Sequence, residues 1–242
     1  MEIKRFATAE DMVHAVAQQV ATAVRRQPDL VLGVPAGRSP VGVYAELGRM
    51  HMAGDVDFSR ATAFAVDEFV GLDRNHPGSF HRFLSEQLLA GVNVPSHQFH
   101  SLNGVADDPD AECERYEAAL EHAGGVGLQL LGIGANGHIG FNEPASELIA
   151  RTHRVTLLEA TRRANAALFG GDETRVPHEA LTMGIGTILR AEAVILIASG
   201  SGKAASVERM VRGPITTHLP ASFLQTHRHV EVYLDLAAAS RL

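Results

Sequence analysis

Apolar residues recur at every fourth position near the start of the chain, at Met12, Val16, Val20 and Val24. This period predicts a helix that buries one face. The segment Thr8–Asp11 has the composition of a capping box and predicts where the helix begins, and Pro28 predicts where it ends. The next apolar run, Leu30–Val34, is short and continuous, which is typical of a buried strand. The chain therefore begins with a helix followed by a strand.

The same alternation continues to the end of the chain. Short apolar runs predict further strands at Thr62–Val66, Leu128–Ile133, Val155–Leu158, Ala193–Ala198 and His229–Asp235. The segments between them predict helices at Ser79–Leu89, Asp110–Ala123, Glu179–Ala191 and Gly202–Val211. Continuous apolar strands between helices predict a three-layer α/β fold of Rossmann-like type, with an open, mostly parallel sheet covered on both faces. No linker-like composition, repeat or low-complexity tract interrupts residues 1–242, so we expect a single domain.

Composition narrows the class of partner and the compartment. The chain has 21 Lys and Arg against 28 Asp and Glu, a net charge of −7, with the basic residues scattered and no Trp. Nucleic-acid binders usually carry a basic stripe, so we expect no nucleic-acid partner. No apolar stretch approaches the roughly eighteen residues that a membrane span needs, and the N-terminus does not resemble a signal peptide. The single cysteine, Cys113, cannot form an internal disulfide, so we expect a cytoplasmic protein without a membrane partner.

Two loops with many small residues follow predicted strands. In open parallel sheets, ligands bind outside the carboxyl ends of the strands. The loop Gly33–Pro40 offers backbone amides, with Ser39 expected to cap the next helix and Pro40 to open it. Such a loop can hold an anion or can be an ordinary tight turn. The loop Ser199–Lys203 adds amides and an ammonium group, without being a Walker loop. Together the two loops predict a phosphorylated ligand.

Asp67 and Glu68 end a predicted strand. Because side chains alternate along a strand, one of the two can face the crevice while the other makes structural contacts. A carboxylate facing the crevice can remove a proton next to a carbonyl group. The alternative is that the pair only caps a helix or forms salt bridges.

The segment Gly132–Pro144 holds four glycines within nine residues, around Asn136, His138 and Glu143. Histidine is the usual proton carrier near neutral pH, and a nearby carboxylate can orient it or change its pKa. The other histidines show no tight metal-ligand spacing. We therefore expect a proton-transfer site without a metal ion or a cofactor.

The segments Gly132–Pro144 and Val66–Asp73 closely resemble the glucosamine-6-phosphate deaminase family. The likeness runs from Leu32 to about Asp235. It also includes, in the expected order, Ser39-Pro40, Asn75–Pro77, Leu102–Gly104, Ala180–Gly186 and the Lys203 loop. The related 6-phosphogluconolactonases share the Gly-x-Gly-x-x-Gly-His core but continue with Thr-Ala-Ser-Leu-Phe-Pro, where this chain has Ile-Gly-Phe-Asn-Glu-Pro.

The resemblance implies conversion of glucosamine 6-phosphate, or a close epimer such as galactosamine 6-phosphate, to a ketose 6-phosphate and ammonia. It implies that Asp67 moves the proton between C2 and C1, and that His138, assisted by Glu143, opens the sugar ring. Asn136 stands where many members have Asp. Its amide can still orient the imidazole, which implies an activity that is changed but not abolished. Gly37, Ser39 and Lys203 would hold the sugar and its phosphate. The segment from about Leu157 to Pro177 would be a mobile lid.

The chain departs from the family pattern at several positions. Ala167 replaces an Arg that reaches the substrate phosphate in the family, while Arg38 stands where Gly is usual and could supply that charge from the other side. Arg162 and Arg163 are further candidates, and a different amino-sugar phosphate is another explanation. His153 and Val155 stand where regulated members carry basic residues. We therefore expect no activation by an acetylated amino-sugar phosphate, and a monomer or small homo-oligomer.

Two other functions stay open at this point. One is a 6-phosphogluconolactonase-like hydrolase, which would act without releasing ammonia and against which Glu143-Pro144 argues. The other is a non-catalytic sugar-phosphate sensor. Such sensors typically carry an attached DNA-binding helical module, for which this chain has no spare length.

Overall fold

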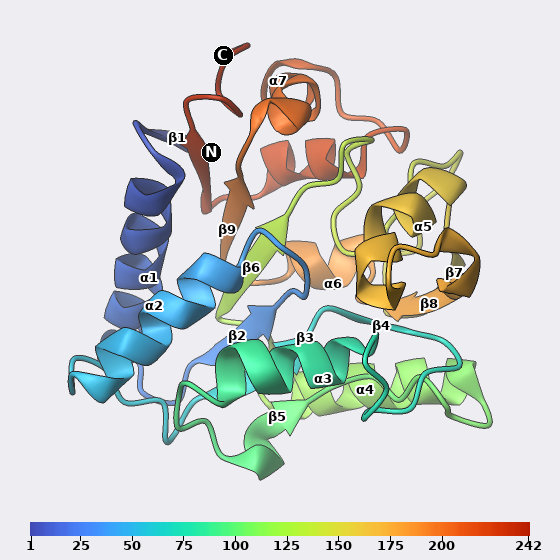
Figure 1. The fold of residues 1–242 in the computed structure, drawn as a ribbon, viewed down its shortest axis with the longest axis horizontal. Coiled ribbons are helices and arrows are strands. Elements are labelled where there is room, and N and C mark those ends of the chain that lie inside the picture. The colour runs from blue at the N-terminus through green and yellow to red at the C-terminus, as the bar shows by residue number, and fades with distance from the viewer.

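The computed structural model describes all residues, 1–242, around a seven-stranded sheet in the order β1-β10-β9-β6-β2-β3-β5. Every neighbouring pair in this sheet is parallel. Its strands are β1 (Glu2–Phe6), β2 (Val31–Val34), β3 (Thr62–Ala65), β5 (Phe99–His100), β6 (Leu128–Gly132), β9 (Ala193–Ala198) and β10 (Val230–Asp235). The arrangement confirms the predicted Rossmann-like fold (Figure 1).

Helices cover both faces of this sheet, because its strands are apolar on both sides. One core layer holds α1 (Ala9–Arg26), α2 (Val41–Met52) and α3 (Phe80–Leu84), and the other holds α4 (Pro109–His122), α6 (Ile185–Leu189) and α7 (Ala204–Arg212). Neighbouring residues of β9 divide between the layers, with Val194 and Leu196 in the second and Ile195 and Ile197 in the first. None of the helices is both long enough and apolar enough to cross a membrane.

A second, three-stranded antiparallel sheet joins β4 (Asp67–Phe69), β8 (Glu179–Thr182) and β7 (His153–Thr156). The prediction of one helix over Glu179–Ala191 is therefore wrong in its first part. Pairing of β8 with both of its neighbours outweighs local helix preference there. Gly184 lies between this strand and α6. Glycine is needed there because a Cβ would lie 2.1 Å from the Arg151 carbonyl oxygen.

Other boundaries differ from the predictions. Helix α2 begins at Val41, with Pro40 as its capping position and no side-chain cap, so the expected cap by Ser39 is wrong. Ser39 instead faces the cavity described below. The predicted strand Val155–Leu158 lies two residues earlier, and the helix over Ser79–Leu89 divides into α3 and a π-helical turn, Ser85–Leu89. The sequence pattern also missed β1, whose residues at the sheet edge are exposed or half-buried, with none fully buried.

The segment expected to be a lid contains α5 (Glu159–Asn165) and two 3₁₀ turns, Ala166–Phe169 and Glu173–Arg175. A third apolar cluster, which includes Phe69, Phe80, Phe141 and Phe169, packs this segment beside the second sheet. In Figure 1 it lies at the right-hand side of the molecule, next to β7 and β8. The apolar cluster therefore holds α5 close to the strand that begins at Asp67.

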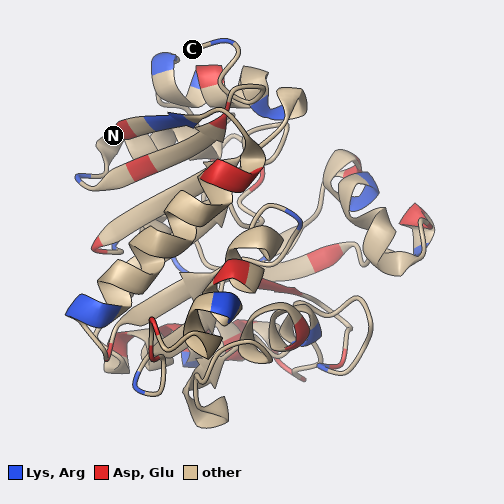
Figure 2. Cartoon of the chain, turned by 60° about the vertical axis from the view of Figure 1, so that its left-hand side comes forward, with Lys and Arg blue, Asp and Glu red and all other residues tan.

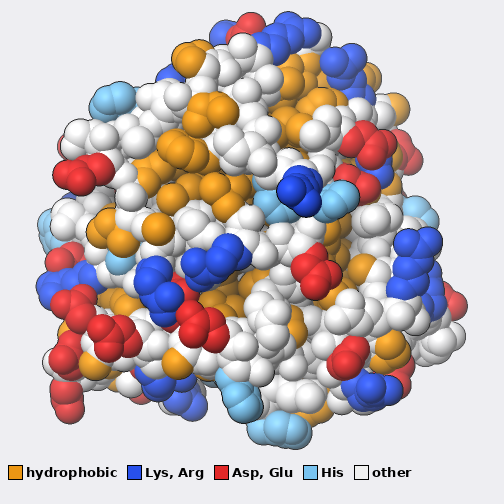
Figure 3. All heavy atoms as spheres, turned by 180° about the vertical axis from the view of Figure 1, so that it is seen from behind, with side chains coloured by type: hydrophobic (Ala, Val, Ile, Leu, Met, Phe, Trp, Pro, Cys, Tyr) orange, Lys and Arg blue, Asp and Glu red, His pale blue; other side chains and the backbone are white.

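Charged residues of both signs are distributed over the whole fold, as the cartoon in Figure 2 shows. The face seen in Figure 3 likewise mixes basic, acidic and hydrophobic side chains.

Candidate active site

A cavity of about 750 Å³ opens at the carboxyl edge of the main sheet. Loops after β2, β6 and β9 form most of its wall, and the start of β4 and helix α5 complete it. Seven of the residues singled out in the sequence line it, namely Gly37, Arg38, Ser39, Asp67, Asn136, His138 and Lys203. The eighth, Glu143, lies behind this wall, buried and in contact with His138. Residues from five parts of the chain therefore meet at one hollow.

Asp67 is the one carboxylate in the cavity wall. It is only 6% exposed, and its side chain takes part in no hydrogen bond or ion pair. The nearby hydroxyls of Tyr44 and Tyr116 donate instead to the carbonyl oxygens of Pro35 and Ala65. Burial, followed by the charge of the neighbouring Glu68, raises the pKa of Asp67 well above its usual range. A carboxylate in this state has a strong tendency to take up a proton.

Glu68 faces the other side of the strand and has a structural role. Its carboxylate accepts hydrogen bonds from the Ser79 hydroxyl at 2.7 Å and from the backbone amides of Phe80 and His81 at 3.0 and 2.9 Å. These amides belong to the first turn of α3, which has no other acceptor for them. The two neighbouring acids therefore divide as alternation along a strand requires, one toward the cavity and one onto a helix.

The His138 loop depends on glycine at two positions. A Cβ at residue 134 would lie 2.4–2.6 Å from the imidazole ring of His138, so only glycine lets the ring lie over the backbone. Gly137 has a φ of +93°, a conformation that other residues rarely adopt. The Asn136 side chain accepts a hydrogen bond from the backbone amide of His138 at 3.1 Å and closes the turn.

Glu143 joins this loop to the lid segment. Its Oε2 accepts a hydrogen bond from Asn136 Nδ2 at 2.9 Å and lies 3.5 Å from His138 Nδ1, while its Oε1 accepts one from the Leu158 amide at 3.3 Å. Burial alone would raise the pKa of Glu143, but hydrogen bonds from His138, Thr161 and Asn136 outweigh it and lower the pKa. The group is therefore a carboxylate at neutral pH, suited to orient an imidazole that gains and loses protons.

Thr161 is a site residue that sequence reasoning missed. It lies on α5, is 2% exposed, and places its Oγ1 3.4 Å from His138 Nδ1. Its only signal in the sequence was its position within the expected lid.

In the Ser199–Lys203 loop, part of the expected anion-binding backbone is already occupied. Asp235 at the end of β10 accepts hydrogen bonds from the Ser199 hydroxyl and the Gly200 amide. These groups fix the loop, and the Lys203 ammonium is left to face the cavity.

The fold and the cavity define a Rossmann-like α/β protein in which an aspartate, a histidine and two basic residues surround one cavity at the carboxyl edge of the sheet. The family model for glucosamine-6-phosphate isomerases/6-phosphogluconolactonase matches residues 4–234. The chain belongs to this family.

Individual relatives agree with this assignment. The chain is 46% identical over 242 residues to glucosamine-6-phosphate deaminase of Arthrobacter sp. (strain FB24), covering 100% of this chain and 93% of the relative. It is 43% identical to glucosamine-6-phosphate deaminase 2 of Bacillus subtilis (strain 168), covering 96% and 94%. A solved monomeric glucosamine-6-phosphate deaminase superposes with a TM-score of 0.97 at 39% identity over 100% of both chains.

More distant structures share the fold alone. A 6-phosphogluconolactonase from Thermotoga maritima superposes with a TM-score of 0.75 at 18% identity, covering 97% of this chain and 98% of its own.

Proposed function

We propose that the protein is an amino-sugar-phosphate deaminase/isomerase. It converts glucosamine 6-phosphate, or a close epimer, and water to a ketose 6-phosphate and ammonia. Because water is consumed as the nitrogen leaves, the overall reaction is a hydrolysis coupled to an isomerisation. The observation that carries the proposal is a buried, unpartnered carboxylate, Asp67, facing the same cavity as the His138 imidazole. The deaminases that match this chain over almost its full length support it.

Ring opening is the first step. The sugar binds as a closed ring, and a proton must leave the anomeric hydroxyl while another reaches the ring oxygen. His138 lies in the cavity wall and can carry this proton between the two oxygens. Glu143 and Asn136 hold the loop and the imidazole in place for it.

Asp67 acts on the open-chain aldehyde. It takes the proton from C2 and returns it to C1, while O1 gains a proton as the nitrogen loses one, so that the C1 carbonyl is reduced to an alcohol as C2 is oxidised to an imine. Water then adds to C2, and ammonia leaves to give the ketose. A carboxylate whose pKa is raised by burial is a stronger base for a carbon-bound proton than an ordinary aspartate.

The phosphate of the substrate anchors the sugar away from the reacting carbons. We assign Gly37, Arg38, Ser39 and Lys203 to the sugar phosphate, since all four line the cavity. No group of three or more His, Cys, Asp or Glu side chains is placed to hold a metal ion. We propose a metal-free, cofactor-free reaction on protein side chains. The monomeric state of a relative of 39% identity supports a monomer or small oligomer.

The test is an ammonia-release assay with glucosamine 6-phosphate and galactosamine 6-phosphate, combined with detection of the ketose phosphate. We expect release with at least one of them, and its loss in Asp67→Asn. Hydrolysis of 6-phosphogluconolactone without ammonia release from either amino sugar would favour a lactonase. Binding of sugar phosphates without any turnover would indicate a sensor.

A further inference from the structure

Glu68 is a buried carboxylate, 1% exposed, that accepts four hydrogen bonds. Its Oε1 accepts from the backbone amides of Phe69 and Phe80 at 2.8 and 3.0 Å. Its Oε2 accepts from the Ser79 hydroxyl at 2.7 Å and from the His81 amide at 2.9 Å. Backbone amides cannot accept a hydrogen bond from a protonated carboxyl group in return. The surroundings of Glu68 therefore fit its ionised form.

Asp67, the preceding residue, has none of these contacts. It faces the cavity, and no ion pair of the chain includes either acid. Burial raises the pKa of Asp67 more than that of Glu68, because only Glu68 has hydrogen bonds that favour the charged form. As pH rises, Glu68 loses its proton first. Asp67 then ionises next to a negative charge that is already present.

The other groups around Asp67 leave this charge uncompensated. Tyr44 on α2 and Tyr116 on α4 donate to backbone carbonyl oxygens, and burial raises the pKa of both, so they are neutral. In the second sheet Asp67 pairs with the neutral Thr182. The other charged or titratable side chains of the cavity wall, none of which forms an ion pair with Asp67, are Arg38, His138 and Lys203.

The surroundings of Glu68 likewise contain no cation that pairs with it. The ring of His81 contacts the Ser101 hydroxyl, and burial followed by the charge of Arg74 lowers the pKa of His81. On the side of the next loop, a Cβ on Gly104 would lie 3.4 Å from Glu68 Cγ, so neutral backbone packs there. The charge of Glu68 is therefore held by hydrogen-bond donors alone.

The helix turn that Glu68 holds is also part of the cavity wall. Phe80 lines the cavity, and its ring lies 4.8 Å from that of Phe69 and 5.7 Å from that of Phe141, measured between centroids. Because the Phe80 amide is one of the donors to Glu68, the same carboxylate fixes where this ring lies.

We propose that Glu68 is a positioning residue for the reaction: its fixed, buried charge makes Asp67 a stronger base, and its hold on α3 keeps Phe80 in the cavity wall. The inference rests on the proposed function and adds a residue that acts in it. A carbon-bound proton is weakly acidic, so a base that binds its proton more tightly removes it faster once ionised. Four uncharged donors keep Glu68 ionised without a cation, which would cancel its effect on Asp67.

The first test is the pH dependence of kcat/KM with glucosamine 6-phosphate in the wild type and three variants. Glu68→Gln removes the charge at nearly constant size. Its acid limb should move down by about one pH unit, and its plateau kcat should fall about 2–5-fold. Glu68→Asp and the matched control Ser79→Ala weaken the hold on α3 but keep the charge. Both should melt lower than the wild type while their acid limbs stay in place.

The second test, NMR titration of the side-chain carboxyl carbons, needs neither substrate nor turnover. Asp67→Asn identifies the signal of Asp67, and Glu68→Asp that of Glu68. We expect Glu68 to titrate at lower pH than Asp67. We also expect Asp67→Asn to leave the Glu68 titration unchanged, since Asp67 is still protonated where Glu68 ionises. This comparison holds even where Glu68→Gln does not fold.

An unchanged Asp67 titration in folded Glu68→Gln would overturn the inference, as would equal shifts in Glu68→Gln and Glu68→Asp. Ionisation of Asp67 before Glu68 would overturn it too. If both titrations behave as expected and no amino-sugar phosphate is deaminated, the proposed function fails while the coupling of the two acids stands. If deamination proceeds with the same acid limb in every variant, the proposed function stands and the role of Glu68 fails.

Discussion

Thr161 Oγ1 lies 3.4 Å from Nδ1 of His138, so a helix of the lid contacts the imidazole that we assign to ring opening. The same nitrogen lies 3.5 Å from Oε2 of Glu143. Two oxygen atoms around one ring nitrogen favour the tautomer with the proton on Nδ1. The Nε2 atom is then free to accept a proton from the sugar. Helix α5 therefore contacts the proposed proton carrier as well as lining the cavity.

Thr161→Val tests this positioning role, because it removes the hydroxyl at nearly constant volume. Loss of one hydrogen bond worth about 0.5–1.5 kcal/mol should lower kcat about 2–12-fold. The KM should change less, since Thr161 holds the imidazole and makes no phosphate contact. Thr161→Ser, which keeps the hydroxyl, is the control and should retain most of kcat. A Val variant with wild-type kcat, or a Ser variant as impaired as Val, would contradict the assignment.

Asp67→Asn should abolish proton transfer at carbon. Removal of a general base typically costs about 10²–10⁴ in rate, and the amide cannot take up the proton. Steady-state kinetics and exchange of the C2 proton with solvent deuterium both measure the effect. Retained C2 exchange in this variant would show that another group is the base.

Activity should depend on pH through the same carboxyl group. Asp67 must be ionised to act as a base, and its pKa is raised. The acid limb of kcat/KM should therefore lie above the pH range of an ordinary aspartate, which titrates near ~3.9. A limb at the ordinary value would contradict the burial argument.

The stability of the fold should fall as pH rises, whereas the activity should rise. Because the folded pKa of Asp67 exceeds the unfolded one, ionisation destabilises the fold progressively as pH rises between the two values. Asp67→Asn removes this penalty, so it should melt higher at pH 7, by about 2–4 °C for each kcal/mol relieved. The wild type and Asp67→Asn should melt alike at low pH, where Asp67 is protonated in both the folded and the unfolded state. Calorimetry at several pH values measures this, and a variant that melts lower at pH 7 would refute it.

Gly134→Ala should displace the His138 ring, because its Cβ would lie 2.4–2.6 Å from ring atoms. A shift of about 1 Å in a reacting group can cost on the order of 10²-fold in rate. Gly132→Ala is the matched control in the same segment, where nothing lies nearer than 3.9 Å. Circular dichroism should show both variants folded, with kcat reduced only in the first. Equal activity of the two would contradict this account.

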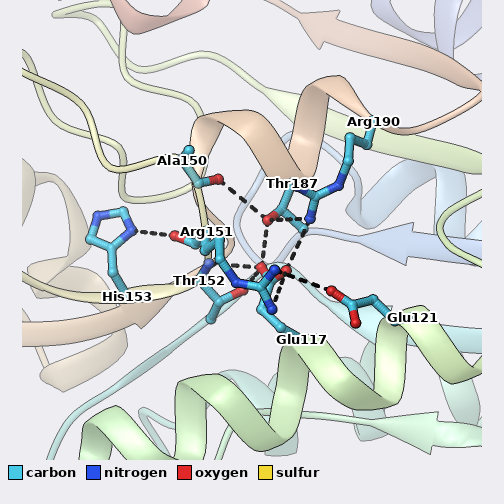
Figure 4. A network of polar contacts seen from close by, with 8 residues as sticks. All are labelled: Glu117, Glu121, Ala150, Arg151, Thr152, His153, Thr187 and Arg190. Atoms are coloured by element: carbon cyan, nitrogen blue, oxygen red, sulfur yellow. Dashed lines mark hydrogen bonds and ion pairs between the residues drawn. The ribbon is translucent and has the colours of Figure 1, made fainter.

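Glu117 should stabilise the junction of the two sheets. Its side chain is 1% exposed and accepts hydrogen bonds from Thr152, Thr187 and Arg190, with Arg151 3.7 Å away (Figure 4). These partners tie α4 to α6 and to the start of β7. The two arginines are more than half exposed and can turn to water, so the main loss in Glu117→Ala falls on the threonine contacts. We expect about 1–3 kcal/mol of destabilisation.

The pH dependence of this effect has a definite sign. Burial alone would raise the pKa of Glu117, but hydrogen bonds from Thr152 and Thr187 outweigh it and lower the pKa. Its contribution is therefore present above the unfolded value of ~4.3 and is lost as pH falls through the folded value. Glu121→Ala removes an exposed partner of Arg151 on the same helix and should change stability by less than about 0.5 kcal/mol. Urea unfolding compares the two, and equal losses would contradict the role of Glu117.

Local patterns in the sequence predicted the elements correctly where a single effect, the burial of apolar side chains, determines the structure. Continuous apolar runs predicted β2, β3, β6, β9 and β10 within two residues, because strands buried on both faces must be apolar throughout. They failed at β8, whose residues 179–182 form a strand through pairing with β4 and β7. β4 lies more than a hundred residues before β8 and β7 is a separate segment before it, and pairing between segments that are not neighbours in the sequence leaves no local signal.

The amino-acid sequence by itself determined the parallel sheet, the glycine-rich turns at its carboxyl edge and the set of acid, imidazole and basic residues on them. Their order along the chain and their chemistry were enough, since parallel strands end at a common edge. Only the tertiary structure decided that Asp67 lies without a partner while Glu68 holds a helix, and that Thr161 reaches His138. It also decided that Arg38 and Lys203 face one cavity while Arg162 and Arg163 turn away. These outcomes depend on which distant groups pack beside each side chain, and burial and pairing of that kind follow from the whole fold.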